Sequence, residues 1–230
     1  MDNDLTSFFK PYEELLNTCD RVFEHVKKSH GELVKCHVAC ADCCHAVFDL
    51  TLIEALYINH HFNRVFTGPD KDFLLENANR ADRQAYKLKR NAYKDLENGK
   101  NEVEILARMA FERVRCPLLD ENNHCRMYDH RPITCRLYGM PTSIAGKAHT
   151  CGRSGFKEGQ SYPTVKLERI QQQLYDLSQA LVTAINSRHI KMAEILVPIS
   201  MAILTNYDDA YLGIGEQPPE NAPRKGARHE

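Results

Sequence analysis

Residues 36–44 have the sequence Cys-His-Val-Ala-Cys-Ala-Asp-Cys-Cys, which places four cysteines within nine positions. Four more cysteines follow in a stretch that is rich in glycine and proline. Thiolates are the soft ligands that zinc and iron-sulfur clusters prefer, and short spacings let one turn of chain aim several sulfurs at one centre. We therefore predict eight metal ligands: Cys36, Cys40, Cys43, Cys44, Cys116, Cys125, Cys135 and Cys151.

The number of cysteines and the character of the N-terminal residues favour metal binding over disulfides. Its nine cysteines are an odd number, and residues 1–4, Met-Asp-Asn-Asp, are acidic where a secretory signal is basic. The longest apolar run, 195–204, is half of the roughly 20 residues that a membrane-spanning helix needs. We expect a cytoplasmic protein, because a reducing compartment keeps thiols free for metal.

Apolar residues at three- and four-residue spacing predict a mainly α-helical chain. Cys19, the ninth cysteine, lies on the apolar face of the first such stretch, so we expect it to be a buried core residue. Thr51-Leu52-Ile53-Glu54 has the form of a capping box and predicts a helix start. The expected helices cover residues 5–35, 51–65, 70–98, 103–114, 167–184 and 189–206.

We expect a single metal-binding helical domain over residues 1–212. Its parts are a cysteine-cluster core at about 34–140, a helical insert at about 66–115, a C-terminal helical hairpin at about 164–206 and a disordered tail at 213–230. Helical periodicity is lost between residues 116 and 162, and no strand alternation replaces it. Since compact domains rarely contain such long irregular segments without a reason, we expect a small helical domain whose cysteine-rich loops are organised by a metal centre.

The net charge of −1, from 30 basic and 31 acidic residues, argues against a protein that coats nucleic acid or a membrane surface. One helix nevertheless carries a basic stripe at three- and four-residue spacing: Arg80, Arg83, Lys87, Arg90 and Lys94. A protein partner on helix 80–94 is one interpretation of this stripe. The other is a solvated face that is balanced by Glu76, Asp82, Asp95 and Glu97. The oligomeric state stays open, although the alanines of this helix could pair with a second copy.

The cysteine spacings occur in a longer motif. Cys36-x3-Cys40-x2-Cys43-Cys44 precedes Phe48-x-Leu50-Thr51 and Glu54-Ala55; Cys116-Pro117-Leu118-Leu119 and Cys125-x2-Tyr128-x2-Arg131-Pro132-x2-Cys135-Arg136-x-Tyr138 follow. Over about residues 34–140 the chain resembles the YkgJ-type cysteine-cluster family, whose members are described as zinc- or iron-chelating proteins. The cluster is also similar to that of the flagellin lysine N-methylases, which is associated with iron-sulfur binding. The resemblance implies a metal but supplies no reaction.

The departures from this family bear on the ligand set and on the activity. Cys151 lies beyond the shared motif, so its role as a ligand rests on spacing alone. A methylase would need a site for S-adenosylmethionine, but Gly213-Ile214-Gly215 follows no strand and opens no helix. A protein lysine methylase-like activity is therefore the weakest of the functions that the sequence suggests, and whether the protein is an enzyme stays open.

Four thiolates suit either an all-cysteine zinc site or a [4Fe-4S] cluster. The irregular spacings, the Cys116-Pro117 pair and the nearby Arg131 and Arg136, which could donate to cluster sulfides as outer-shell groups, favour iron-sulfur with a redox or cluster-dependent role. The alternative is a zinc-stapled interaction module without catalysis. Four histidines beside the cysteines compete as ligands: His37, His45, His124 and His130.

Overall fold

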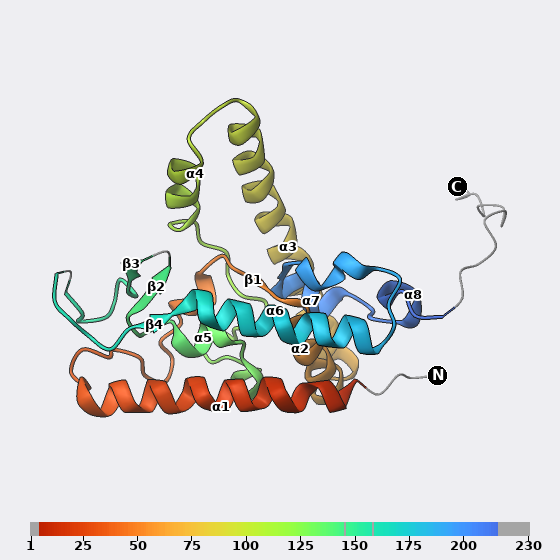
Figure 1. Ribbon diagram of the computed structural model, residues 1–230, viewed down its shortest axis with the longest axis horizontal. Coiled ribbons are helices and arrows are strands. Elements are labelled where there is room, and N and C mark those ends of the chain that lie inside the picture. Colours follow the sequence, from red (N-terminus) through yellow and green to blue (C-terminus); the bar gives the residue numbers. More distant parts are fainter. Residues whose placement is uncertain (1–4, 145, 158, 216–230) are drawn as a thin grey trace.

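The computed structural model describes residues 5–144, 146–157 and 159–215, and its architecture is mainly α-helical (Figure 1). The α-helices of the described residues are α1 (Thr6–Ser29), α2 (Leu52–Val65), α3 (Gly68–Glu97), α4 (Glu102–Met109), α5 (Ile133–Leu137), α6 (Leu167–Ala184), α7 (Ile199–Leu204) and α8 (Asp209–Leu212). None of them is long and apolar enough to cross a membrane. The prediction of a mainly α-helical fold with the clustered cysteines in irregular segments is confirmed.

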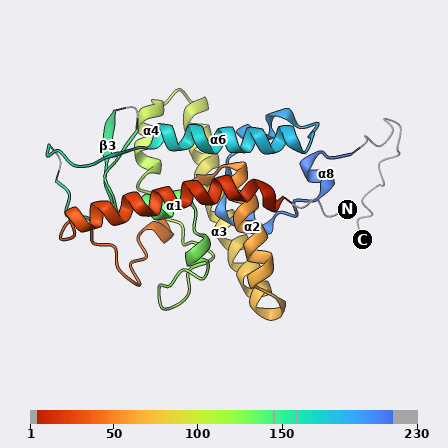
Figure 2. The ribbon, with the colours of Figure 1, turned by 60° about the horizontal axis from the view of Figure 1, so that its bottom comes forward.

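Two long helices, α1 and α6, run antiparallel and in contact along one side of the molecule (Figure 1, Figure 2). The apolar face of α1 is buried in the larger of two hydrophobic clusters, which it shares with α2, α5 and α6. Cys19 lies on that face and is only 2% exposed, as the helical periodicity predicts.

The α2 helix begins where the capping box predicts. The Thr51 N–H and the Thr51 hydroxyl both donate to one carboxylate oxygen of Glu54, at 3.1 and 3.0 Å. This first turn is buried, so α2 carries its cap into the interior of the protein. The helix ends at Val65, which is also the predicted boundary.

The α3 and α4 helices form an antiparallel pair that projects from the body (Figure 1). Near the body, the alanine face of α3 (Ala78, Ala81 and Ala85) is buried, and α7 packs against α3. This face therefore serves the protein's own core. The predicted 103–114 helix ends early, at Met109, because Arg113 instead forms an antiparallel bridge with Ala46.

The C-terminal hairpin expected at 164–206 does not form. The α6 helix is as predicted, but residues 189–206 divide into a 3-10 turn (Ile190–Glu194), strand β5 (Val197–Pro198) and α7. Pro198 has no N–H for helix continuation and precedes the first turn of α7. Instead of pairing with α6, α7 packs mainly on α2 and α3.

Short strands, which the sequence analysis did not identify, connect the irregular regions. Strand β1 (Asp49–Leu50) pairs antiparallel with β5, and β2 (Thr142–Ile144) lies between β3 (Lys147–His149) and β4 (Val165–Lys166). Two or three residues are too few to show alternation. Of the predicted tail, residues 213–215 are described, and Ile214 packs on the core; residues 216–230 lie outside the described residues.

Candidate metal centre

Five of the eight predicted ligands line a single cavity of about 50 Å³. They come from three segments: Cys43 and Cys44 from the 3-10 turn Cys43–His45, Cys116 and Cys125 from the loop after α4, and Cys135 from α5. Apolar side chains of α2, α3 and the start of α7 complete the wall. The fold thus brings together cysteines that are up to 92 positions apart in the sequence.

Backbone pairing holds the first two segments together. The Cys116 N–H donates to the Cys44 carbonyl at 2.7 Å, and the Val114 N–H donates to the His45 carbonyl at 3.0 Å. These bonds continue the bridge between Ala46 and Arg113. The early end of α4 is therefore what aligns the chain before Cys116 with the first cysteine cluster.

The loop that carries Cys116 and Cys125 is a compact turn. Leu119 and Cys125 form an antiparallel bridge, and the Asp120 carboxylate accepts the N–H groups of Asn122 and His124 at 2.9 and 2.7 Å. An aspartate that satisfies the backbone two residues ahead stabilises a turn without metal. Both cysteines are consequently oriented by local structure.

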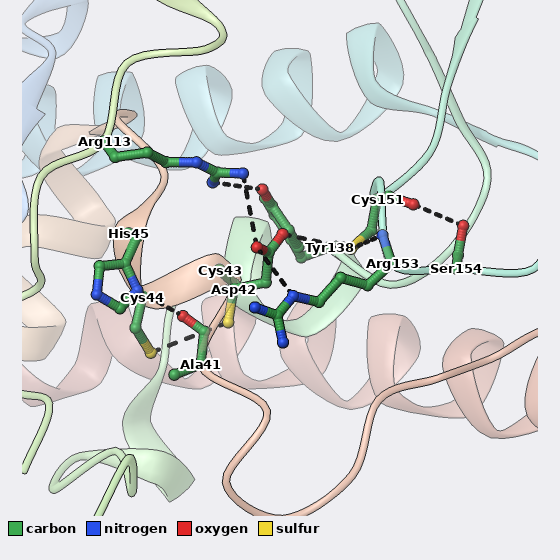
Figure 3. A network of polar contacts seen from close by, with 10 residues as sticks. All are labelled: Ala41, Asp42, Cys43, Cys44, His45, Arg113, Tyr138, Cys151, Arg153 and Ser154. Atoms are coloured by element: carbon green, nitrogen blue, oxygen red, sulfur yellow. Dashed lines mark hydrogen bonds and ion pairs between the residues drawn. The ribbon is translucent and has the colours of Figure 1, made fainter.

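The Sγ atoms of the adjacent residues Cys43 and Cys44 lie 4.0 Å from each other (Figure 3). In a tetrahedral zinc site, Zn–S bonds of about 2.3 Å place two sulfurs about 3.8 Å apart. The neighbouring positions of these cysteines in the sequence therefore do not prevent them from sharing a centre.

The protonation of the thiols also reflects their convergence. Hydrogen bonds from the Cys135 and Cys44 thiols lower the pKa of Cys43, while the same bonds raise the pKa values of Cys135 and Cys44. Burial raises the pKa of Cys116 to about 12 and also raises that of Cys125. The five thiols therefore interact electrostatically with one another, and metal binding would release the protons that they carry.

Backbone N–H groups support two of these sulfurs. The N–H of Leu118 donates to Cys116, and the N–H of Met127 donates to Cys125, so each sulfur accepts a bond from two residues further along. Such bonds favour the thiolate and tune the potential of an iron-sulfur centre. In the metal-free protein these bonds offset part of the cost of burial, and the pKa of each thiol stays above its ordinary value.

Cys135 is positioned by Glu54, a residue that the sequence analysis assigned only to the cap of α2. Besides its bonds to Thr51, the Glu54 carboxylate accepts the Ile133 N–H at 3.2 Å, so it joins the first turn of α2 to the first turn of α5. Glu54 is buried, and burial raises its pKa. A capping-box glutamate inside an apolar run was the only sequence signal for this role.

The two predicted outer-shell arginines differ in position. Arg136 is buried; its guanidinium pairs with Asp20 of α1 and donates to the carbonyls of Arg131 and Asp129 at 2.9 and 2.6 Å. Arg136 therefore ties α5 to α1. The Arg131 guanidinium lies 3.8 Å over the Tyr128 ring, and its residue lines the cavity, where its positive charge contributes to lowering the pKa of Cys43.

The other three predicted ligands, Cys36, Cys40 and Cys151, do not line the five-thiol cavity. Burial, together with the neighbouring Cys40 and Cys151, raises the pKa of Cys36 to about 11. The Cys151 thiol donates to the Asp42 carboxylate at 3.4 Å, and Arg113 and Arg153 lie 3.5 Å from the other oxygen of Asp42 (Figure 3). These three cysteines form an outer group beside Cys43.

The four candidate histidines do not line the cavity either. Nδ1 of His37 and Nδ1 of His45 are within hydrogen-bond distance of the carbonyls of Val38 and Ala41, at 2.7 and 2.9 Å. His124 lies 3.6 Å from Asp120, and the ring of His130 stacks on that of His61 at 3.8 Å. The structure therefore gives each of them a partner other than the five thiols.

Within the described ranges, no three or more His, Cys, Asp or Glu side chains have the geometry to hold a metal ion as they stand. The chemistry of the donor set nevertheless fits a thiophilic metal. Five sulfurs face one cavity, and two accept backbone N–H bonds. To bind a metal, the thiols must lose their protons, and the sulfur atoms that line the cavity must move closer together.

No curated protein and no solved structure gives a significant match to this chain. A family comparison does: the matched residues, 35–152, include all eight clustered cysteines and just over half of the chain. The YkgJ subtype suggested by the motif is a finer assignment and stays a prediction. The chain belongs to the CxxCxxCC family, described as a putative zinc- or iron-chelating domain.

Proposed function

We propose that this protein carries an iron-sulfur cluster, held by four of the five cavity thiols, and that the cluster has a redox or cluster-dependent role. The observation that carries the proposal is the convergence of Cys43, Cys44, Cys116, Cys125 and Cys135 on one cavity. The family membership supports a zinc- or iron-binding cysteine cluster. Eight clustered free thiols suit a reducing cytoplasm, which we propose as the compartment.

The size of the cavity favours a cluster over a single ion. A zinc site draws four sulfurs to about 3.8 Å from one another and leaves no space between them. Here a cavity of about 50 Å³ lies among five thiols that come from three segments of the chain. The remaining volume suits the inorganic sulfides of a cluster.

An iron-sulfur cluster supplies electron transfer when it is bound. The protein's own contribution is to bury the sulfurs beside apolar walls, to donate the N–H groups of Leu118 and Met127 to two of them, and to place the Arg131 charge near Cys43. The N–H groups and the Arg131 charge favour the thiolate form, whereas burial opposes it and excludes water from the sulfurs. Glu54 and Arg136 keep Cys135 in place from the two sides of α5.

The test is spectroscopic and uses the full chain, purified without oxygen from iron-supplied cells. We expect brown protein with a broad absorption near 400 nm that bleaches on reduction, and about four irons and four acid-labile sulfides per chain for a [4Fe-4S] centre. Colourless protein that stays colourless after reconstitution with iron and sulfide would contradict the proposal. Stoichiometric zinc without a redox response would establish the alternative, a zinc-stapled interaction module.

A matched pair of variants links the metal to the cavity. Cys125→Ser/Cys135→Ser should lower the iron content at least fivefold, because it leaves three of the five cavity sulfurs and a cluster needs four. Cys19→Ser, which changes a buried cysteine of α1 outside the cavity, should leave the iron unchanged. Equal iron in both variants would mean that the cluster, if present, is held elsewhere. A lysine methylase-like activity would additionally require S-adenosylmethionine binding, which equilibrium dialysis measures.

A further inference from the structure

The projecting part of α3 and α4, residues 80–112, is here called the arm (Figure 1). Its charge changes sign along the chain. Residues 80–94 contain six basic side chains and one acidic side chain, whereas residues 95–112 contain five acidic and two basic ones. The first segment belongs to α3, and the second comprises the last three residues of α3, the turn, and α4 with its C-terminal flank. Most of α3 in the arm is therefore basic, and the end of α3, the turn and α4 together are net acidic.

The acidic residues of α3 do not neutralise its basic stripe. Asp95 pairs with Lys100 and Arg108, and Asp82 accepts a hydrogen bond from Ser200 at 3.2 Å. Arg80 lies 3.8 Å from Glu76, and Lys89 pairs with Asp49 in the body. Within the described part of the chain, the remaining basic side chains of the stripe are exposed and have no carboxylate partner: Arg83, Lys87, Arg90 and Lys94.

The acidic segment 95–112 also contains exposed charged side chains without ion-pair partners among the described residues. Glu97, Glu102 and Glu104 are exposed, and none of them forms an ion pair with a described residue. Large apolar side chains lie among these charges: Tyr93 is 61% exposed, Leu96 49%, Val103 63% and Leu106 60%. In α4 only Ile105 is buried. Apolar residues grouped with unpaired charges of both signs are typical of a protein interface.

We propose that the arm is a self-association surface, on which the basic segment 80–94 of one chain lies along the acidic segment 95–112 of a second copy. A two-fold axis makes such a contact reciprocal, because each arm supplies both halves. The basic stripe from Arg80 to Lys94 is about 21 Å long at 1.5 Å per helical residue, so several charge pairs fit along it. The apolar side chains would be covered by the same contact.

A second copy fits this surface better than nucleic acid. The glutamates of the arm would repel a polyanion that ran past its tip, whereas they find basic partners on a second arm. This inference is independent of the metal at the cysteine cavity. Its failure would leave the proposed function untouched, and a metal-binding defect would leave the arm untouched.

The experiment is light scattering and sedimentation of the full, metal-loaded chain at about 1–100 µM, in low and in high salt. We expect a dimer that weakens at least tenfold from 50 to 500 mM salt, because the pairing is ionic. Two charge-reversal variants, Arg83→Glu/Lys87→Glu/Arg90→Glu and Glu97→Lys/Glu102→Lys/Glu104→Lys, should each be monomeric with unchanged metal content. A mixture of the two should form a heterodimer.

The matched control is Lys27→Glu/Lys28→Glu, which reverses exposed charges at the end of α1 and should leave the dimer intact. Circular dichroism of every variant establishes that it is folded. A wild-type monomer throughout the concentration range would overturn the proposal, and so would a dimer that both reversals leave intact. Two monomeric variants that fail to pair when mixed would also overturn it. Binding of a 20-nucleotide RNA to a monomer through the stripe would instead assign this face to nucleic acid.

Discussion

At the scale of single residues, close packing around the cysteines excludes larger side chains. The backbone of Gly139 lies against the side chain of Cys36: a Cβ added at Gly139 would lie 2.1 Å from the Cys36 sulfur. The absence of a side chain at residue 139 is thus what allows Cys36 to occupy its position. The sequence shows this glycine as one of many in an irregular segment.

Gly139→Ala should therefore destabilise the protein by about 1–3 kcal/mol, as overpacking does, and should displace Cys36. Urea unfolding measures the free energy, and thiol alkylation in the folded state measures the accessibility of Cys36. Gly152→Ala is the control, because a Cβ there meets nothing within 4 Å. Equal stability of the two variants would contradict the close approach.

Glu54 does more than cap α2, because it also accepts a hydrogen bond from α5. Glu54→Ala should destabilise the fold by about 1–3 kcal/mol for each backbone N–H left without an acceptor, those of Thr51 and Ile133. Glu54→Gln keeps an acceptor oxygen and should recover part of this loss. Thermal unfolding of the three proteins, followed by circular dichroism, checks the order. If Glu54→Ala has the same melting temperature as the wild type, the carboxylate does not stabilise the contact between α2 and α5.

The stability of the wild type relative to Glu54→Gln should also depend on pH. Burial raises the pKa of Glu54, so the native state holds this proton after the unfolded state has lost it. The favourable contribution is complete below the unfolded pKa of about 4.3 and is lost as the pH rises through the higher native pKa. Urea unfolding of both proteins from pH 4 to 7 measures the difference. An advantage of the wild type that grows over this range would contradict the direction of the shift.

At the scale of secondary structure elements, buried polar side chains lock the short α5 helix to its longer neighbours. Glu54 reaches α5 from α2, and Arg136 reaches from α5 to Asp20 of α1. A five-residue helix has too few internal hydrogen bonds to be stable alone. These two contacts therefore determine where Cys135 lies.

Replacing Arg136 with methionine keeps a long apolar side chain but removes the donors to Asp20, Asp129 and Arg131. We expect a loss of about 2–4 kcal/mol, less than for a fully buried pair because Asp20 is 40% exposed. The stability of Arg136→Lys should lie between those of the wild type and Arg136→Met, since one ammonium group replaces only part of the hydrogen bonds that the guanidinium donates. The control Arg21→Ala, on the exposed side of α1, should change stability by less than about 0.5 kcal/mol. Chemical denaturation gives all three values.

At the scale of the whole molecule, two hydrophobic clusters hold the helices together, and the cysteine-bearing loops lie at their edge. The larger cluster joins α1, α2, α5 and α6, and the smaller joins α2, α3 and α7 to the loops of Cys116 and Cys125. Because both clusters consist mainly of apolar contacts, we expect the helical body to fold without metal. The loops add the thiols at its edge.

Removal of the metal should therefore leave most of the helical circular dichroism but lower the melting temperature by about 10 °C. Three to four kcal/mol of lost ligand binding has this effect on a chain of this size, at about 2–4 °C per kcal/mol. Differential scanning calorimetry before and after anaerobic chelation checks the shift. Loss of the helical signal on chelation would show that the metal, and not the two clusters, holds the body together.

The sequence by itself determined the helices with strong local signals: the amphipathic face of α1, the capping box of α2 and the long repeat of α3. It also determined the cysteine-cluster family, because ligand type and spacing are properties of the chain. The helix expected at 189–206 was interrupted, since the packing of α7 on α2 and α3 outweighs local apolar periodicity. Only the tertiary structure decided which cysteines converge, because Glu54, Arg136 and the Ala46–Arg113 bridge act between residues far apart in sequence. Long-range contacts of this kind leave no periodic signal, and for this reason the division into five cavity thiols and three outer cysteines was not visible in the spacing.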